Sequence, residues 1–377
     1  TTGAPGPVHL QFRGNEGQVD LEEAEMDGLV EGQFSRVPPF RPEPEAAHVK
    51  AALELLQKAE RPIIVAGGGA RASGAGKELV ALAEALQIPI ATSLNGKDII
   101  PGVHPLSAGV VGSYSRESAN RAVNSADLVC FVGTETGGMT THFWAVPKIG
   151  TPAIQIDLEP EALGRNYPLQ ASVLGDAKSV LVRMLGQIDK STAAKRANWI
   201  KDIAALRNDW YAKYKPMLES DAVPIHPARV CGELSRHMPD DAIVVVDTGH
   251  AGMWMGGMYD LRTPAQSYMR SAGHLGWAFP AGIGAKAACP DRPVVVFTGD
   301  AGFWYHIGEV ETAVRWNIAS VTIVNNNGGG NQSKRGFDRA YGGEQTEQAR
   351  ELWTYRKMNF ARIAEDIGAL GIRVEHA

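Results

Sequence analysis

The chain has 377 residues, of which 44% are hydrophobic, and its formal net charge at pH 7 is -5. That is enough apolar material for two domains with full cores, and the mildly acidic balance argues against nucleic acid as a partner. No run of about 18 apolar residues occurs, so no membrane span is expected.

The three cysteines are far apart and stand among apolar or small residues. Cys130, Cys231 and Cys289 are therefore interpreted as reduced thiols of a cytoplasmic protein, and not as a disulfide framework or a metal site.

The N-terminal stretch predicts one strand and then a linker. Val8-His9-Leu10-Gln11-Phe12 alternates apolar and polar residues after Gly6-Pro7. A single strand is not stable, so its sheet partners are expected outside this sequence. Residues 14–45 are polar, acidic in the middle and rich in proline at the end, which is typical of an inter-domain linker.

Residues 46–190 predict a parallel sheet with helices on both faces, because strands and helices alternate. Strands are expected at 62–65, 88–91, 127–132 and 153–156, with helices around 49–56 and 78–86. The run Gly67-Gly68-Gly69 follows the first strand, and it either cradles a dinucleotide phosphate or makes a sharp turn. A long charged helix over 192–215 lies in a second linker, 191–225.

The third unit, 226–377, opens with a strand at 242–246 that ends at Asp247-Thr248-Gly249-His250. A helix follows, and a turn from strand to helix attracts phosphate through its free amides. His250 is alternatively a simple helix cap. Later elements are expected as a helix from Trp277, a long loop after Asn327 that reaches Trp353, a helix at 360–370 and a strand at 372–374.

Two apolar runs at 294–297 and 321–324 predict neighbouring strands, with one helix over 304–317 as the crossover. The crossover brings Asp300 and Asn327 to the same edge of the sheet. The amides of Ala301 and Gly302 suit phosphate there, and Asp and Asn oxygens suit Mg²⁺, which keeps phosphate oxygens among its ligands. Alternatively, Asp300 only caps a helix.

The pattern Gly299-Asp300-Ala301-Gly302, a helix, and Asn326-Asn327 resembles the thiamin-diphosphate-binding motif of the acetolactate synthase-like superfamily. The family pattern begins Gly-Asp-Gly, so Ala301 is a departure, although a small one that leaves room for phosphate. Asn95-Gly96-Lys97 and Ile156-Asp157-Leu158 are similar to the family's central domain. The resemblance implies an α/β fold of two doubly wound parallel-sheet domains, a Rossmann-like one at 46–190 and a diphosphate-binding one at 226–377. Residues 1–13 would be the last strand of a largely missing pyrimidine-binding domain.

The resemblance also implies the site residues. Mg²⁺ would be held by Asp300, Asn327 and the carbonyl of Gly329, and Leu275, which by itself reads as a core residue, would wedge between the two rings of the cofactor. The activating Glu is expected on the missing domain, so no catalytic residue is assigned. The implied cofactor contacts are Gly249, His250, Gly273, Leu275, Gly299, Asp300, Ala301, Gly302 and Asn327.

Flavin-bearing members place an Arg shortly after the glycine that corresponds to Gly133, where this chain has Thr134-Glu135-Thr136. Glu135 would repel a pyrophosphate, so FAD is not expected. ADP binding and a purely structural role for the central domain both stay open.

The resemblance implies an enzyme, dependent on thiamin diphosphate and magnesium, that cleaves or forms C–C bonds next to a carbonyl. Leu275-Gly276 and Phe279-Pro280-Ala281 resemble the synthases, which act as 2-oxo acid decarboxylases or carboligases. Glu309-Val310-Glu311-Thr312 resembles 2-hydroxyacyl-CoA lyase or oxalyl-CoA decarboxylase instead. A non-catalytic nucleotide-binding subunit is the alternative from another class. The implied partners are a small 2-oxo acid or acyl-CoA, a pyrimidine-binding domain from the missing segment or another chain, and further copies in a homodimer or homotetramer.

Overall fold

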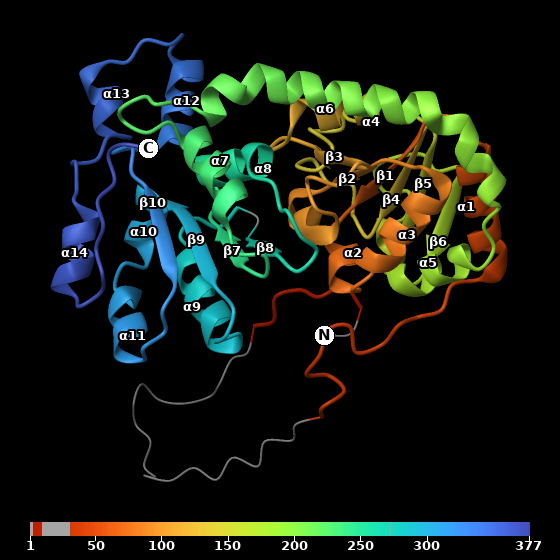
Figure 1. Cartoon of the computed structure of the whole chain (residues 1–377), viewed down its shortest axis with the longest axis horizontal. Helices are drawn as coiled ribbons and strands as arrows, with labels where there is room; N and C mark the ends of the chain where they lie inside the picture. Colours follow the sequence, from red (N-terminus) through yellow and green to blue (C-terminus); the bar gives the residue numbers. More distant parts are fainter. Residues whose placement is uncertain (1–2, 10–30, 272) are drawn as a thin grey trace.

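A computed structural model of the chain describes residues 3–9, 31–271 and 273–377. Two lobes, each built on a parallel sheet, lie beside each other, and the long helix α6 (Ala197–Leu218) runs along both (Figure 1). The prediction of two parallel-sheet α/β domains is confirmed. None of the helices in these ranges is long and apolar enough to cross a membrane.

The first sheet has six parallel strands in the order β3-β2-β1-β4-β5-β6. The central strands β1 and β4 are runs of apolar residues that are buried along their whole length, as expected for central parallel strands. Helices α1, α3 and α5 cover one face, and α4 and α6 cover the other. The strands are β1 (Pro62–Ala66), β2 (Ile90–Thr92), β3 (Ser107–Val110), β4 (Leu128–Val132), β5 (Ala153–Asp157) and β6 (Ala171–Leu174). The helices are α1 (Ala46–Lys58), α2 (Gly68–Ala72), α3 (Gly76–Leu86), η1 (Leu94–Ile99), α4 (Glu117–Asn124), η2 (Pro160–Ala162), α5 (Ala177–Leu185) and η3 (Lys190–Arg196).

The second sheet has four parallel strands in the order β10-β9-β7-β8. Helices α7 and α8 pack on one face and α9 on the other. The strands are β7 (Ile243–Val246), β8 (Ser267–Arg270), β9 (Val294–Gly299) and β10 (Val321–Asn325). The helices are α7 (Pro227–His237), α8 (His250–Met258), α9 (Ala278–Ala288), α10 (Asp300–Tyr305), α11 (Glu309–Arg315), α12 (Asn331–Ala340), α13 (Glu347–Glu351) and α14 (Phe360–Asp366).

Several predicted elements differ from the structure. The single helix expected over 304–317 is two helices, α10 and α11, because the chain makes tight i-to-i-3 turns at His306 to Glu309. The long loop expected after Asn327 contains α12 and α13. The strand expected at 372–374 is wrong: this stretch is coil, and the side chain of Ile372 is 71% exposed. Val8 and His9 are also coil, and the rest of the first predicted strand lies outside the described residues.

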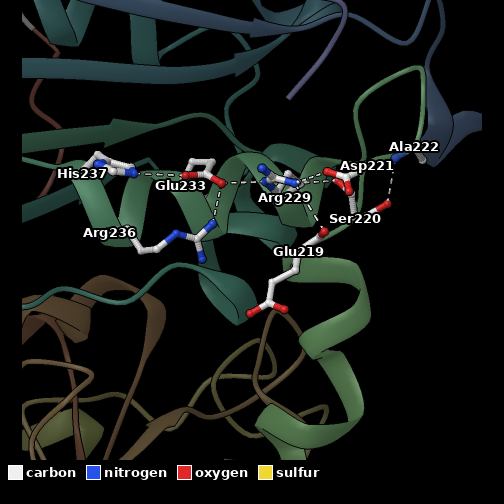
Figure 2. Close-up of polar contacts among 8 residues, drawn as sticks. All are labelled: Glu219, Ser220, Asp221, Ala222, Arg229, Glu233, Arg236 and His237. Atoms are coloured by element: carbon white, nitrogen blue, oxygen red, sulfur yellow. Dashed lines mark hydrogen bonds and ion pairs between the residues drawn. The ribbon is translucent and has the colours of Figure 1, made fainter.

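One arginine holds the turn between the long helix α6 and α7. The guanidinium of Arg229 donates to the carbonyls of Glu219 and Ser220 and to the carboxylate of Asp221 (Figure 2). Its Nε donates to Glu233 one turn further along α7. Since all these bonds converge on one side chain, the direction in which the chain enters the second lobe is fixed.

A buried ionic network joins the two lobes. Arg116, from the loop before α4, donates to the carboxylate of Asp260 at 2.9 Å and to the carbonyl of Gly257 at 3.0 Å. Lys97 of η1 donates to the carbonyl of Gly256 at 3.0 Å. Burial, and after it the charge of Arg116, lower the pKa of Lys97 to about 7.

The face of α8 that meets the first lobe is made of glycine. A Cβ placed on Gly256 would lie 2.8 Å from the carbonyl oxygen of Tyr114, and one on Gly257 would lie 3.1 Å from that of Ser115. Only glycine allows the loop of the first lobe to approach this closely. Helix α8 therefore belongs to the second lobe and packs directly against a loop of the first lobe.

Candidate cofactor site at the edge of the second sheet

The carboxyl ends of β9 and β10 meet at one edge of the second sheet. Their register pairs Gly299 with Asn325, so Asp300 and the asparagines that follow β10 lie after neighbouring strands, as the crossover predicted. The side chain of Asp300 is almost fully buried, with 3% of its surface exposed.

The carboxylate of Asp300 accepts two backbone hydrogen bonds. Ala301 N donates to Oδ1 at 2.8 Å, and Gly329 N donates to Oδ2 at 3.1 Å. Burial raises the pKa of Asp300, although these N–H groups oppose the rise. No cationic side chain in the described parts of the chain forms an ion pair with it, and a buried charge without a counter-charge is costly. A hard divalent cation would supply that counter-charge, so the donor set fits Mg²⁺.

This geometry changes two details of the predicted site. The amide of Ala301 was expected to be free for phosphate, but it donates to the carboxylate beside it. Gly329, chosen for its carbonyl, also contributes its N–H to Asp300. The segment that follows Asn327 is thus tied directly to the end of β9.

The two asparagines after β10 differ in their surroundings. Asn326 Oδ1 accepts from Gly328 N at 3.2 Å, and its Nδ2 donates to the carbonyl of Met358 at 3.0 Å. Asn327 is exposed, and its side chain forms no hydrogen bond with another described residue. Asn326 therefore has a structural role, whereas Asn327 keeps its amide oxygen available for a ligand.

Three of the other predicted contacts are glycines with open space beside their backbone. Gly249 has φ of +73°, and a Cβ there would meet only Gln332 and Leu275, at 3.9 to 4.0 Å. A Cβ on Gly273 or on Gly299 would meet nothing within 4 Å. These backbones leave room for a ligand, as a cofactor cradle requires. Leu275 is half-buried at the rim of this space, so its interpretation as a core residue is wrong.

His250 is the first residue of α8, and Gly249 is the N-cap. The alternative that His250 caps the helix is therefore wrong. Burial, and then the charge of Arg335, lower the pKa of His250 below its ordinary value. The amino end of this nine-residue helix and the charge of Arg335 both make the position electropositive.

Two features of this edge were not predicted. Asp247, directly after β7, is 1% exposed and accepts hydrogen bonds from three segments of the chain. Gln332 of α12 donates to the hydroxyl of Tyr114 at 2.6 Å, which connects the site to the first lobe. The sequence does contain a signal for Asp247, because it stands directly after a strand, as Asp300 does. No signal in the sequence indicates that Gln332 pairs with Tyr114.

The glycine run in the first lobe serves close packing. A Cβ on Gly67 would lie 2.2 Å from the carbonyl oxygen of Gly133, and Gly69 N donates to that same oxygen at 2.9 Å. Gly67 N in turn donates to the carbonyl of Val132. The ends of β1 and β4 thus press against each other, and two of the three glycine amides are already used, which favours the sharp turn over the phosphate cradle.

Two family profiles match the chain. "Thiamine pyrophosphate enzyme, central domain" covers residues 49–184, and "Thiamine pyrophosphate enzyme, C-terminal TPP binding domain" covers residues 247–377.

Similar proteins include a probable acetolactate synthase large subunit from Methanocaldococcus jannaschii, 31% identical over 99% of this chain and 63% of the relative. The acetolactate synthase isozyme 3 large subunit of Escherichia coli is 28% identical over 87% of this chain and 57% of its own length. A sulfoacetaldehyde acetyltransferase from Castellaniella defragrans is 30% identical over 88% and 58%. The chain thus spans less than two thirds of the length of these relatives.

Proposed function

Because the chain belongs to the thiamine pyrophosphate enzyme family, we propose that it holds thiamin diphosphate and Mg²⁺ at the edge of its second sheet. The observation that carries the proposal is the buried carboxylate of Asp300, which has backbone donors but no ion pair among the described residues. The open space beside Gly249, Gly273 and Gly299 supports it.

The proposed roles follow from where each group lies. Asp300, Asn327 and the carbonyl of Gly329 would hold Mg²⁺. The amino end of α8 at Gly249 and His250, together with Gly299, Gly302 and the small side chain of Ala301, whose amide stays bonded to Asp300, would receive the diphosphate. Gly273 and Leu275, in the loop before α9, would contact the rings. When bound, thiamin diphosphate supplies a nucleophilic carbon that lets a bond next to a carbonyl break or form.

We propose a 2-oxo acid decarboxylase or carboligase of the acetolactate synthase type, because acetolactate synthase large subunits are among its relatives. A 2-hydroxyacyl-CoA lyase or an oxalyl-CoA decarboxylase is the alternative.

The proposal includes a pyrimidine-binding domain from another segment or chain, a homodimer or homotetramer, and a cytoplasmic location, which the three unpaired cysteines support. An activity screen with pyruvate, oxalyl-CoA and formyl-CoA, with the pyrimidine-binding domain supplied, separates these reactions; turnover of a CoA ester but not of pyruvate would contradict the synthase assignment.

The two neighbouring asparagines provide a matched pair for the metal site. Asn327→Ala is expected to weaken magnesium-dependent cofactor binding by about tenfold or more, the usual scale for losing a metal-site contact. Asn326→Ala is expected to lower the unfolding midpoint, because Gly328 N and the Met358 carbonyl lose their partner. Calorimetry with and without Mg²⁺, beside thermal unfolding, measures both. The reverse pattern would reassign the ligand to Asn326.

The purified protein is expected to contain no flavin, because Glu135 carries a negative charge where flavin-binding relatives carry a positive one. Its backbone carbonyl accepts from Asn166 at 2.9 Å, which fixes the loop that presents it. An absorption spectrum without the yellow flavin band is the expected result, and a stoichiometric flavin band would refute it. ADP binding in the first lobe remains a separate proposal that calorimetry with ADP decides.

A further inference from the structure

Asp247 is the buried carboxylate for which the proposed function has so far given no role. It follows β7, which pairs with both β8 and β9 and is therefore internal to the sheet. Only 1% of its surface is exposed, and burial raises its pKa against the opposing effect of its hydrogen bonds. It forms no ion pair with a described residue. A buried charge in this position requires an explanation.

Its two oxygens accept from three separate segments. Oδ1 accepts from Thr248 N at 2.8 Å and from Gly276 N at 3.0 Å. Oδ2 accepts from Thr298 Oγ1 at 2.7 Å and from Gly276 N at 3.1 Å. The carboxylate thus connects the end of β7, the end of β9 and the loop that carries Leu275.

The three segments leave no spare space around this carboxylate. A Cβ on Gly302 would lie 2.2 Å from Asp247 Oδ2 and 2.9 Å from Thr298 Oγ1. A Cβ on Gly276 would lie 3.0 Å from the carbonyl oxygen of Gly302 and 2.8 Å from Cβ of Tyr305. The loop therefore sits directly on the first turn of α10, the helix that Asp300 begins.

We propose that Asp247 is a positioning residue that sets the loop of Leu275 against the strand end of Asp300. This rests on the proposed function, in which Leu275 would contact the rings of the cofactor and Asp300 would hold the metal. With Leu275 toward the rings and Asp300 toward the metal, the carboxylate of Asp247 determines the distance between the two halves of the site. A ligand held at both ends requires that distance to be kept closely.

The chemistry of the partners explains why the residue is an acid and not an amide. All three partner groups are donors, two N–H groups and one hydroxyl, and a carboxylate offers acceptor oxygens on both sides. In either orientation an asparagine would turn its NH₂ group toward the N–H of Gly276, which approaches both oxygens of Asp247. Asp247→Asn keeps the size of the side chain and removes one acceptor oxygen and the negative charge.

The test compares Asp247→Asn with Asp157→Asn. Asp157 is also a buried acid at the end of a parallel strand, but in the first lobe and with a local acceptor role toward Glu159 N. Hydrogen exchange by mass spectrometry follows the peptide that contains Leu275 and Gly276 in the ligand-free chain. Asp247→Asn is expected to speed exchange there by about tenfold or more, as for a lost hydrogen bond to a charged acceptor, while Asp157→Asn leaves it unchanged.

A second measurement connects this result to the ligand. Affinity for thiamin diphosphate at saturating Mg²⁺, with the pyrimidine-binding domain supplied, is expected to fall about tenfold in Asp247→Asn only. If the unaltered chain does not bind thiamin diphosphate, the proposed function fails, and the exchange data still decide whether Asp247 holds the loop. Unchanged exchange at Gly276 in folded Asp247→Asn would overturn the proposal.

If Asp247→Asn does not fold, Thr298→Val is the substitute variant for the hydrogen-exchange test. It replaces the hydroxyl that donates to the carboxylate from the side of β9 with a methyl group of similar size. A severalfold increase in exchange at Gly276 is expected, the scale of one neutral hydrogen bond. No change at Gly276 in folded Thr298→Val would equally overturn the proposal.

Discussion

Replacing Asp300 with Ala is expected to abolish magnesium-dependent binding of thiamin diphosphate while the fold survives. The variant removes the only carboxylate of the proposed metal site, and Mg²⁺ binds in such sites through one or two carboxylates together with substrate phosphates. The fold survives because the removed carboxylate is itself buried without an ion pair among the described residues, so its loss offsets the lost bonds to Ala301 N and Gly329 N.

Calorimetric titration of thiamin diphosphate, with Mg²⁺ and then with EDTA, measures this effect in the presence of the pyrimidine-binding domain. Asp240→Ala is the matched control, because Asp240 is an exposed acid in the same domain, before β7. The control is expected to bind as the unaltered chain does. Equal affinity in Asp300→Ala and in the unaltered chain would refute the metal site.

Replacing Asp260 with Ala is expected to destabilise the protein by about 3–5 kcal/mol, the usual cost of breaking a buried ion pair by removing one partner. Arg116 would remain buried, with its side chain 2% exposed and its guanidinium stacked 4.2 Å from the ring of Trp210. It would keep its bond to the Gly257 carbonyl but lose its counter-charge. Urea unfolding followed by tryptophan fluorescence measures the difference.

A surface pair provides the control for Asp260. Lys213 and Glu117 form an ion pair between side chains that are 58% and 50% exposed. Glu117→Gln is expected to leave the unfolding midpoint nearly unchanged, because solvent screens such a pair. An equally small effect for Asp260→Ala would show that the network does not hold the lobes together.

Lowering the pH is expected to remove the contribution of Asp260 to the free energy of unfolding. Burial alone would raise the pKa of Asp260, but the charges of Arg116 and Lys97 outweigh burial and hold that pKa below its ordinary value. A carboxyl with a lowered pKa stabilises the folded state above the unfolded-state pKa, and this contribution disappears as the pH falls through the folded-state pKa. The difference in unfolding free energy between the unaltered chain and Asp260→Ala should therefore be full at neutral pH and shrink below about pH 4.

The strands that the sequence predicts well are those with a strong local pattern. Val294–Phe297 is an unbroken apolar run and Val321–Val324 is an unbroken run of β-branched residues, and both are strands in the structure. Strand β3 is Ser-Ala-Gly-Val and β8 is Ser-Tyr-Met-Arg, and neither has such a run, so both were missed. Their strand conformation comes from pairing with β2 and β7, which is a tertiary effect.

The residues of the candidate site also differ in whether a local sequence signal predicts them. Asp300 could be predicted because an acid after a buried strand and before a helix is a local signal. The partners of Asp247 could not, because Gly276 and Thr298 come from other segments of the chain and meet at one carboxylate only after the sheet forms. The distinction between Asn326 and Asn327 likewise depends on Met358, which α14 brings near.

The glycine face of α8 has a consequence for the exchange of domains between relatives. The helix begins at Gly249 and His250 and then presents Gly256 and Gly257 to the loop at Tyr114 and Ser115. A chimaera that takes its first domain from one relative and its second from another would press a foreign loop against this face. Only transplanting the loop and the helix together would preserve this contact between the lobes. The loop and the helix are therefore expected to be inherited as one unit.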